Sequence, residues 1–369
     1  MKRIVKATYL LFVGLFMASS MVAVVDAQQT DPLRDRQQIL PDGGAEEDNP
    51  IFIKVGQAGF TFMKLPTNAR NAALGDAGVG QIGSGAAGVF LNPATLAFFE
   101  GREAFATHVE WIAGTKAEVI GAAFNLQGRG TIGIGFQTYD AGTFNATSID
   151  TDPAGNGFTN DGTFSTSNYA ITAGYGLKIT DRFAIGANFK LAHQDLGNGS
   201  VLVGGNLTTI SNSKNAFAFD LGTYFNTGFR NTVLAMSVQN FSQELTYQRE
   251  SFELPRNIRL GVLVDVLSIA GNTPVPHHLN LAFDITNPVD FDEQVLAGLE
   301  YTFQAAGSPL GFSGRGGYKT NHDTESFSFG GGLKYLTEAG KGLKIDYAYK
   351  KFDANFFSSV HVVTAAIDF

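Results

Sequence analysis

The chain from residue 104 to its end alternates between apolar and polar side chains with a period of two, which is the pattern of β-strands with two different faces. In one stretch, Leu343, Ile345 and Tyr347 share one face and Lys344 lies on the other. Fourteen such segments can be counted, at residues 104–113, 117–126, 130–140, 165–178, 182–195, 214–226, 231–240, 256–267, 277–286, 293–304, 310–319, 325–336, 342–351 and 360–369.

The length of these segments separates a membrane barrel from a soluble β-protein. Most have ten to fourteen residues, close to the ~9–11 that a tilted strand needs to cross a bilayer, whereas soluble strands have about 5–6. A propeller would repeat every ~40–50 residues, and the chain has no such repeat. A large lectin-like sandwich remains the soluble alternative. The pattern therefore predicts an all-β fold, a 14-stranded antiparallel transmembrane β-barrel over residues 104–369.

The connections between the segments differ in length on the two sides of the predicted barrel. Links after even-numbered segments are short, whereas three links after odd-numbered segments are long, at residues 141–164, 196–213 and 241–255. Outer-membrane barrels have short periplasmic turns and long outer loops. An even number of strands with this asymmetry predicts an outer-membrane location with both termini in the periplasm. The aromatic C-terminus, Phe369, fits a last barrel strand.

The N-terminal region has no alternating pattern. Residues 1–27 combine a basic start, an apolar stretch and small residues up to Ala27, which predicts a secretory signal peptide. Its apolar run is shorter than the ~20 residues of a spanning helix. Residues 28–50 are acidic and polar and predict a flexible periplasmic tail.

Residues 51–103 are rich in alanine and glycine and predict short helices joined by tight turns. Asn92 suits a helix N-cap, and Pro93 suits the first helical position after it. A barrel of fourteen strands has a wide interior that needs filling. We therefore expect this segment to form a helical plug in the lumen.

Composition narrows the range of functions. The net charge is −8, charged residues are 16% of the chain, and there is no cysteine. These values argue against nucleic-acid binding, disulfides and cysteine-ligated metals. A mean hydropathy near zero fits a barrel that is apolar outside and polar inside.

Two motifs resemble ligand-binding sites, one for a dinucleotide and one for calcium, but the surrounding sequence does not support either. Residues 83–88 match the G-x-G-x-x-G of dinucleotide sites, but no βαβ unit surrounds them, so tight turns are the favoured interpretation. Asp150, Asp152, Asn156 and Asp161 resemble the start of a calcium loop, although Ala154 replaces a ligand. A solvated acidic loop is favoured there and calcium binding is left open. No nucleophile arrangement or metal spacing is present, so no cofactor and no enzymatic activity are expected.

Three stretches together resemble one family. These are residues 58–80, which include Arg70 and Gly75, the Asn92–Ala97 box, and His108–Ala113 with His108 and Trp111. They are similar to the opening, the Asn-Pro-Ala box and the first-strand motif of PorV/PorQ outer-membrane proteins, within the FadL-like superfamily. Leu74 and Leu91 depart from the usual residues. The match covers roughly residues 57–113.

The resemblance implies a FadL-like barrel with an N-terminal hatch and a role in type IX protein secretion. The implied partners are the translocon barrel and the C-terminal signal domains of secreted cargo, besides outer-membrane lipid. It gives a structural or gating role to the plug residues Asn92, Pro93, Ala94, Leu96, Arg70 and Gly75. The alternative is a FadL-type passive transporter with a hydrophobic small ligand in the lumen, which would need an apolar pocket and a lateral opening at a strand kink.

Overall fold

The computed structural model describes most of the chain after residue 57, namely residues 58–81, 83–149, 156–203, 206–229, 231–247, 250–269, 277–322, 325–336, 341–352 and 357–369. The predicted signal peptide, the acidic tail and the first residues of the predicted plug lie outside this part.

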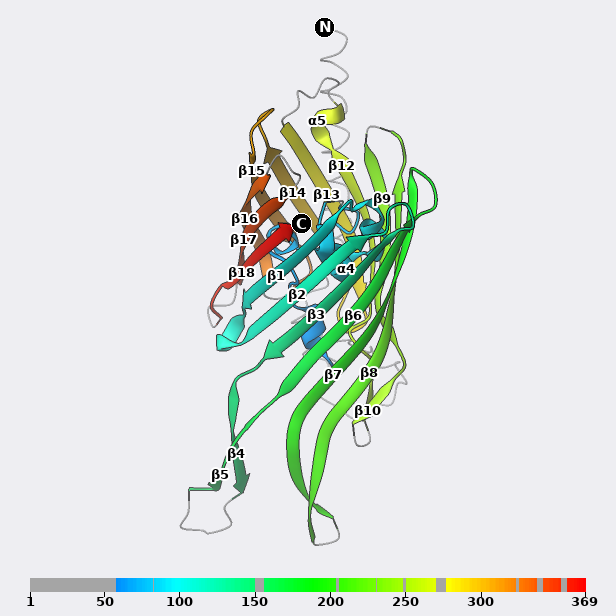
Figure 1. The fold of residues 1–369 in the computed structure, drawn as a ribbon. Coiled ribbons are helices and arrows are strands. Elements are labelled where there is room, and N and C mark those ends of the chain that lie inside the picture. Colours follow the sequence, from blue (N-terminus) through cyan, green and yellow to red (C-terminus); the bar gives the residue numbers. More distant parts are fainter. Residues whose placement is uncertain are drawn as a thin grey trace, which may run out of the picture. The chain divides into compact units, whose positions relative to one another are not determined.

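Fourteen antiparallel strands close into one barrel (Figure 1), which confirms the predicted fold class. Their order around the barrel is β1-β18-β17-β16-β15-β14-β13-β12-β9-β8-β7-β6-β3-β2. The bounds are β1 Arg102–Glu110, β2 Lys116–Asn125, β3 Thr131–Asp140, β6 Ser167–Lys178, β7 Phe183–Val203, β8 Asn206–Asn226, β9 Thr232–Ser242, β12 Asn257–Asp265, β13 His277–Pro288, β14 Gln294–Phe303, β15 Leu310–Lys319, β16 Glu325–Leu336, β17 Gly342–Phe352 and β18 Val360–Asp368.

The two ends of the barrel differ, and we name them by what they carry. The terminal end is where β1 begins and β18 ends, since Glu103 pairs with Asp368 there. The loop end is opposite and carries two hairpins outside the barrel sheet, β4 (Thr143–Ile149) with β5 (Phe158–Ser165) and β10 (Leu245–Tyr247) with β11 (Glu250–Phe252). The short helix α5 (Val266–Ile269) follows β12 at the terminal end.

The prediction of a long loop at residues 196–213 is wrong, because β7 and β8 continue through this region as paired strands. Their pairing shifts register between Asp195 and Asn198, and Gly197 has a φ of +85°. A bulge of this kind moves the following side chains to the opposite face. The period-two pattern is therefore interrupted although the strand is not. The predicted loops at 141–164 and 241–255 likewise contain the β4–β5 and β10–β11 hairpins.

The first strand also differs from its prediction. It begins at Arg102, inside the stretch assigned to the plug, and ends at Glu110, so Trp111 is not part of it. The Trp111 amide donates to the Thr115 carbonyl, which closes a turn around the 3₁₀ helix η5 (Ile112–Gly114). This turn joins β1 to β2 at the loop end.

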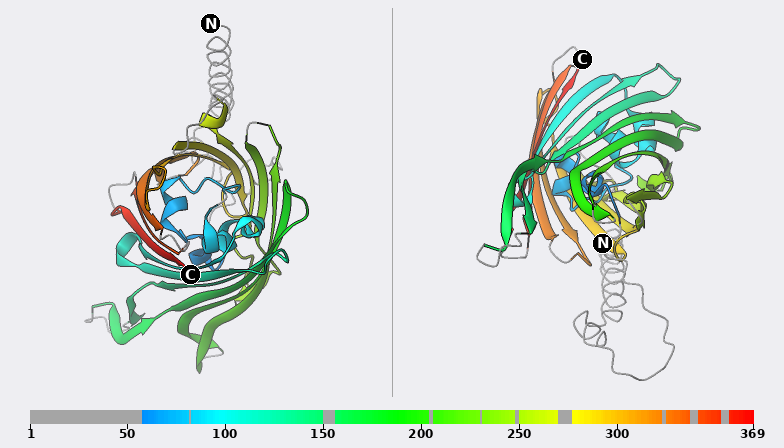
Figure 2. Two further views of the ribbon diagram at one scale, coloured as in Figure 1. Left: turned by 45° about the horizontal axis from the view of Figure 1, so that its top comes forward. Right: turned by 90° about the horizontal axis from the view of Figure 1, so that it is seen from below.

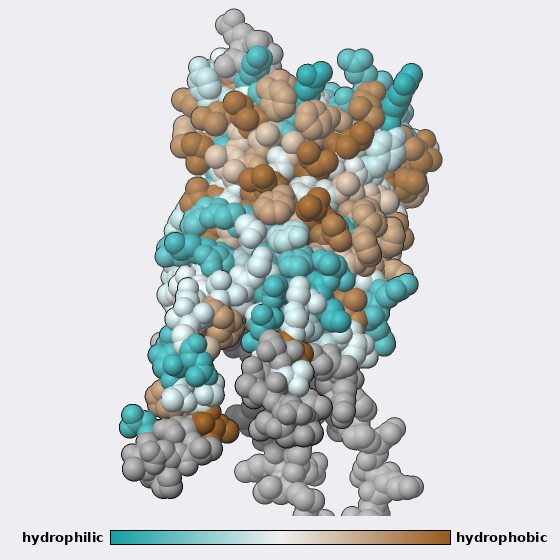
Figure 3. Space-filling model, turned by 60° about the horizontal axis from the view of Figure 1, so that its bottom comes forward, coloured by the Kyte–Doolittle hydropathy of each residue, from teal (hydrophilic) through white to brown (hydrophobic). Residues whose placement is uncertain are grey.

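Large apolar side chains cover the outside of the barrel wall. Figure 3 shows them as a band, with a mainly hydrophilic surface between the band and the loop end. Exposed members on the barrel strands include Ile120, Ile134, Phe189, Phe217, Phe219, Leu260, Phe283, Leu299, Phe312, Phe329, Leu343 and Ile367. An outward apolar band on a closed antiparallel barrel is the architecture of bacterial outer-membrane proteins, which places this barrel in the outer membrane.

Residues 58–81 and 83–101 lie within the ring of strands as short helices and turns (Figure 2). The helices are η2 (Thr61–Lys64), α3 (Ala69–Ala73), η3 (Gly85–Ala87), α4 (Gly88–Leu91) and η4 (Pro93–Phe98). Within the described part of the chain, no helix is long and apolar enough to cross a membrane. The segment starts at the loop end, where the Gly59 amide donates to the Glu253 carbonyl, and it leads into β1 at the terminal end. We call residues 58–101 the plug.

Candidate functional site: the plug and two luminal cavities

The Asn92–Ala97 box fixes one side of the plug. The Asn92 side chain caps η4 by accepting from the Ala94 amide at 3.0 Å, as its N-cap position predicts. Its Nδ2 donates to the Val79 and Thr223 carbonyls, at 2.9 and 3.1 Å. Asn92 is fully buried. One side chain thus joins η4, the preceding plug loop and strand β8.

Glycines on β6, β7 and β8 let this box lie directly against the wall. A Cβ on Gly186 would lie 2.3 Å from the carbonyl carbon of Pro93, and one on Gly176 would lie 2.6 Å from the Pro93 oxygen. A Cβ on Gly222 would lie 2.0 Å from Oδ1 of Asn92. Real Cβ atoms do not approach this closely, so the box fits this wall only because these three wall residues lack side chains.

Helix α3 packs on the other side of the lumen, against β15 to β18. Asn68 caps it, accepting from the Asn71 amide at 2.9 Å. The alanines Ala69, Ala72 and Ala73 are fully buried and form an apolar cluster with Ala348 of β17. Small residues on both surfaces give close contact.

The turn after α3 lies on a belt of small wall residues. A Cβ on Gly317 would lie 2.0 Å from the carbonyl carbon of Leu74, and one on Gly298 would lie 2.8 Å from the Leu74 oxygen. The Gly75 amide, with φ of +67°, donates to Oγ of Ser328 at 2.8 Å. Gly75 therefore has both a conformation that favours glycine and a close wall contact.

Arg70 projects from α3 into a buried ion-pair cluster that we call the Arg70 cluster. Its guanidinium donates to both carboxylate oxygens of Glu300, at 2.7 and 2.8 Å. Arg315 donates to the same carboxylate at 2.7 Å and to Asp346 at 2.5 Å. Glu300 is 1% exposed, so it depends on these two arginines for compensation of its charge.

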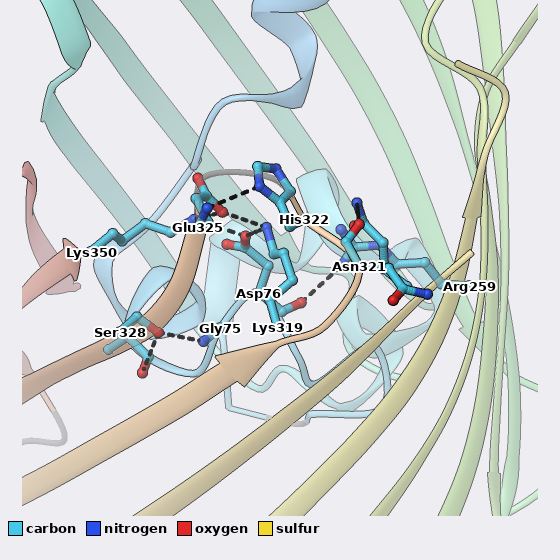
Figure 4. Close-up of polar contacts among 11 residues, drawn as sticks. Gly75, Asp76, Arg259, Lys319, Asn321, His322, Glu325, Ser328 and Lys350 are labelled. Atoms are coloured by element: carbon cyan, nitrogen blue, oxygen red, sulfur yellow. Dashed lines mark hydrogen bonds and ion pairs between the residues drawn. The ribbon is translucent and has the colours of Figure 1, made fainter. Parts of the chain in front are cut away.

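Asp76 projects from the other end of the same segment into a second cluster, the Asp76 cluster (Figure 4). Its carboxylate accepts from Lys319 at 2.7 Å and from Lys350 at 2.8 Å. Both lysines also lie within 3.2 Å of Glu325. Burial alone would raise the pKa of Asp76, but the two lysines hold it below its usual range. Asp76 is therefore ionised in the closed structure.

His322 lies in the turn between β15 and β16, beside this cluster (Figure 4). Its Nδ1 accepts from the Glu325 amide at 3.1 Å. Burial, together with Lys319 and Lys350, lowers the pKa of His322, with Glu325 and Asp76 acting in the opposite direction. The neutral imidazole is the form that accepts this hydrogen bond.

A cavity of about 480 Å³ lies between the plug and the loop end. Its lining includes the apolar side chains Phe62, Leu65, Phe90, Trp111, Tyr139 and Phe352. The cations Lys190, Arg259, Lys319 and Lys350 also line it. Arg259 donates from Nη1 to the Asp76 carbonyl at 2.8 Å, and its buried Nε has no hydrogen-bond partner among the described residues.

A second cavity, of about 570 Å³, lies on the terminal side of α3. Arg70, Glu300, Arg315 and Asp346 line it, together with the turn between β14 and β15. The two cavities share no lining residue. We call them the loop-end cavity and the terminal-end cavity.

The residues that sequence analysis singled out are divided between two walls. Asn92, Pro93, Ala94 and Leu96 lie against β6 to β8, whereas Arg70 and Gly75 lie against β14 to β16. Trp111 lines the loop-end cavity and packs edge-on against Phe352 with ring centroids 5.7 Å apart. His108 points outward and lies 2.6 Å from Glu118.

Neither Asp76 nor its barrel partners stand out in the sequence as candidate site residues. The lysines had one signal, their phase, because Lys319 and Lys350 lie opposite the apolar faces of their segments. Glu325 shares the phase of the outward-facing Phe327 and Phe329, and it turns inward through the irregular pairing between Glu325 and Ser328. Of the acidic-loop residues, Asp150 and Asp152 lie outside the described residues. In the part of the chain that the structure does describe, no group of three or more His, Cys, Asp or Glu side chains could hold a metal ion.

The fold and the site define a class of protein: a fourteen-stranded transmembrane barrel whose lumen is closed by an N-terminal helical plug. No family model matches the chain, and no curated protein matches it. Solved structures of the same architecture do match.

Three of these are FadL-type or toluene-transporting barrels. The Pseudomonas aeruginosa FadL homologue has a TM-score of 0.55 and 11% identity, and the match covers 83% of this chain and 99% of that one. The Ralstonia pickettii toluene transporter TbuX has a TM-score of 0.52 and 14% identity, with 81% and 96% covered. The Pseudomonas putida toluene transporter TodX has a TM-score of 0.51 and 12% identity, with 80% and 96% covered.

At these identities the likeness shows the fold, which is FadL-like. The finer resemblance to PorV/PorQ proteins finds no support in these comparisons. Of the two functions considered for the sequence, the comparisons agree better with the FadL-type alternative.

Proposed function

We propose that the protein is a passive transporter of small, largely apolar organic molecules across the outer membrane, and not an enzyme. The observation that carries this proposal is the loop-end cavity, which is enclosed by the barrel wall and closed below by the plug. Its volume of about 480 Å³ lies within the range of ~300–1,000 Å³ that small-molecule sites occupy. Its lining is mixed: the aromatic and aliphatic side chains suit an apolar body, and charged side chains, Arg259 among them, offer polar contacts.

The orientation belongs to the same proposal. The loop end carries the long hairpins, and most connections at the terminal end are short turns. This is expected if the loop end faces outward and the terminal end faces the periplasm. The chain's C-terminal Phe369 then lies on the periplasmic side. The first described plug residue, Ala58, lies at the loop end, bridged to Glu253, so the predicted periplasmic position of the N-terminus rests on residues outside the described part.

Uptake by vesicles tests the transport proposal. We expect vesicles with lipopolysaccharide in the outer leaflet to take up labelled toluene faster with the barrel than without it. Lipopolysaccharide is needed because a plain phospholipid bilayer is already permeable to toluene. Equal rates with and without the folded barrel would contradict the proposal.

Type IX secretion remains a second candidate, because two features favour protein contacts. One is the sequence resemblance over residues 57–113. The other is the β4–β5 hairpin, which exposes Ile149 at 85% and presents the stacked rings of Phe144 and Phe164, 5.5 Å apart. Exposed apolar side chains on a projecting hairpin suit a protein partner. Co-purification of a translocon barrel or of cargo signal domains would support this candidate, and their absence from native membrane extracts would contradict it.

A further inference from the structure

The two cavities lie along the same wall and differ in which side of α3 they occupy. On β15, Arg315 lines the terminal-end cavity and Lys319 the loop-end cavity, with Gly317 between them. On β17, Asp346 and Lys350 do the same, with Ala348 between them. Each step is two residues, so all these side chains project into the lumen. The centres of the two clusters are thus about 13 Å apart along a strand.

Among the described residues, the segment Ala69–Asp76 lies between the two cavities on strands β15 to β17. Its backbone lies on the small residues between the two clusters: Leu74 contacts Gly298 and Gly317, and Ala73 lies over Gly330. The segment also carries one charge into each cluster, Arg70 on one side and Asp76 on the other. It fills this side of the lumen, opposite the Asn92–Ala97 box, and is held by ion pairs at both ends.

The described strands form a closed ring of pairs around segment 69–76. Their pairing is irregular between β7 and β8, between β8 and β9, and between β16 and β17. The β16–β17 irregularity lies beside this segment, where Glu325 accepts from Lys319 and Ser328 accepts from the Gly75 amide. The β8–β9 bulge places Asp220 opposite Gln239 and Asn240, and polar contacts fill it. Lys190 lies 2.8 Å from both Asp220 and Asn240, and Gln239 donates to the Phe90 carbonyl of the plug at 2.6 Å.

We propose that transport through this barrel is axial, along the inner face of β14 to β17, and that residues 69–76 are its gate. The inference rests on the proposed transport function and adds the route and the moving part. Displacement of the gate joins the two cavities into one path from the loop end to the terminal end. Ion pairs line the path on both sides of the gate, so the open path is wet and admits ions as well as small organic solutes. A lateral exit into lipid would not give ions a way across the membrane.

Ion conductance across planar bilayers tests the route directly. The double variant Arg70→Met with Asp76→Asn, which we call the unlatched variant, removes the charge at both ends of the gate. We expect its mean conductance in potassium chloride to exceed that of the unmodified barrel by roughly tenfold or more, because small changes in differential stability shift a closed–open equilibrium strongly.

The matched control loosens the opposite side of the plug. Asn188 and Gln239 donate to the Val89 and Phe90 carbonyls of α4, at 2.7 and 2.6 Å. Asn188→Ala with Gln239→Ala removes two contacts from the plug without touching the gate, and its conductance should stay close to that of the unmodified barrel. The axial gate would be overturned if the unlatched variant did not conduct ions. It would also be overturned if the control variant conducted as well as the unlatched variant.

A reversible lock provides a second measurement if the unlatched variant does not fold. The chain has no cysteine, so introduced pairs are the only thiols. Leu74 Cβ lies 3.0 Å from a Cβ built on Gly298, and Val89 Cβ lies 3.2 Å from one built on Gly133; a disulfide needs about 3.5–4.5 Å, a small adjustment. Oxidised Leu74→Cys with Gly298→Cys should block toluene uptake and recover it on reduction, whereas the Val89→Cys with Gly133→Cys lock should leave uptake unchanged. The reverse pattern would overturn the proposal.

These measurements separate the two proposals. If the barrel takes up no toluene but the unlatched variant conducts, the gate stands and the proposed substrate class fails. If toluene is taken up and the unlatched variant stays ion-tight, the transport function stands and the axial route fails.

Discussion

The plug meets two walls of the barrel in different ways. Against β6 to β8, the Asn92–Ala97 box lies backbone to backbone on glycines, with buried hydrogen bonds from Asn92. Against β14 to β17, the segment 69–76 is short, half alanine and glycine, and held at each end by a charge. Both contacts are close-packed on wall glycines. Segment 69–76 differs because its ion pairs line the two cavities, where they can exchange with water and ions. The comparison therefore assigns the fixed part of the plug to the box and the movable part to α3.

The largest effect is expected where the Asn92–Ala97 box lies on the wall glycines. Gly186→Ala places a Cβ 2.3 Å from the Pro93 carbonyl carbon, and neither backbone can yield easily. Overpacking of this kind costs about 1–3 kcal/mol. We expect a lower midpoint for heat-induced unfolding, measured by gel migration in detergent. Gly314→Ala is the control, since a Cβ there has no neighbour within 4 Å. Equal midpoints for the two variants would contradict close packing of the box on this wall.

A comparable but more local effect is expected at the gate. Asp76→Asn leaves Lys319 and Lys350 with only Glu325 as a counter-charge. A hydrogen bond to a charged group contributes about 1.5–3 kcal/mol, so amides 69–76 should exchange faster while those of the strands do not. Hydrogen exchange followed by mass spectrometry measures this. Asp161→Asn, on strand β5 of the exposed β4–β5 hairpin, is the control. Unchanged exchange at 69–76 would exclude Asp76 as a latch.

Acid should loosen the gate in two stages. The lowered pKa of His322 means that the folded protein favours the neutral ring, so its contribution to stability is present above about pH 6.5 and is lost as the pH falls through the lowered folded value. Protonation costs the hydrogen bond to the Glu325 amide and adds charge beside Lys319 and Lys350. The protection factor of that amide, which corrects for the intrinsic pH dependence of exchange, should fall as the pH drops below about 6.5, but not in His322→Gln.

The second acid stage belongs to Asp76. Its pKa lies below the usual value near 3.8, so the stability it provides is present above that value and is lost only as the pH falls through the lower folded value. The contacts of Asp76 should therefore survive at pH 5. Release of segment 69–76 well above pH 4 in His322→Gln would contradict the depressed pKa.

The smallest effect is expected at the outer surface. His108 and Glu118 are both about half exposed, at 47% and 54%, and exposed pairs contribute at most about 1 kcal/mol. His108→Gln should change neither toluene uptake nor the unfolding midpoint beyond that. A large loss of function would instead give the first-strand motif a role that the outward position of His108 does not explain.

Local patterns predicted most of the fold, because the alternation of each strand can be recognised from the residues of that strand alone. The fourteen barrel strands and the cap at Asn92 follow from such patterns. Long-range contacts have no local signature. The bulge at Gly197 interrupted the alternation of β7, so a paired extension was predicted as a loop. Arg70 was singled out by resemblance, but Glu300, 230 residues away, becomes its partner only through barrel closure.

The most direct test of this account is the hydrogen exchange of the unmodified barrel, compared between two segments of the plug. If α3 is the movable part, amides 69–76 should exchange at least about tenfold faster than those of 92–97, since local opening reports local stability. Equal rates, or faster exchange at 92–97, would contradict the assignment of the gate to the α3 side of the lumen.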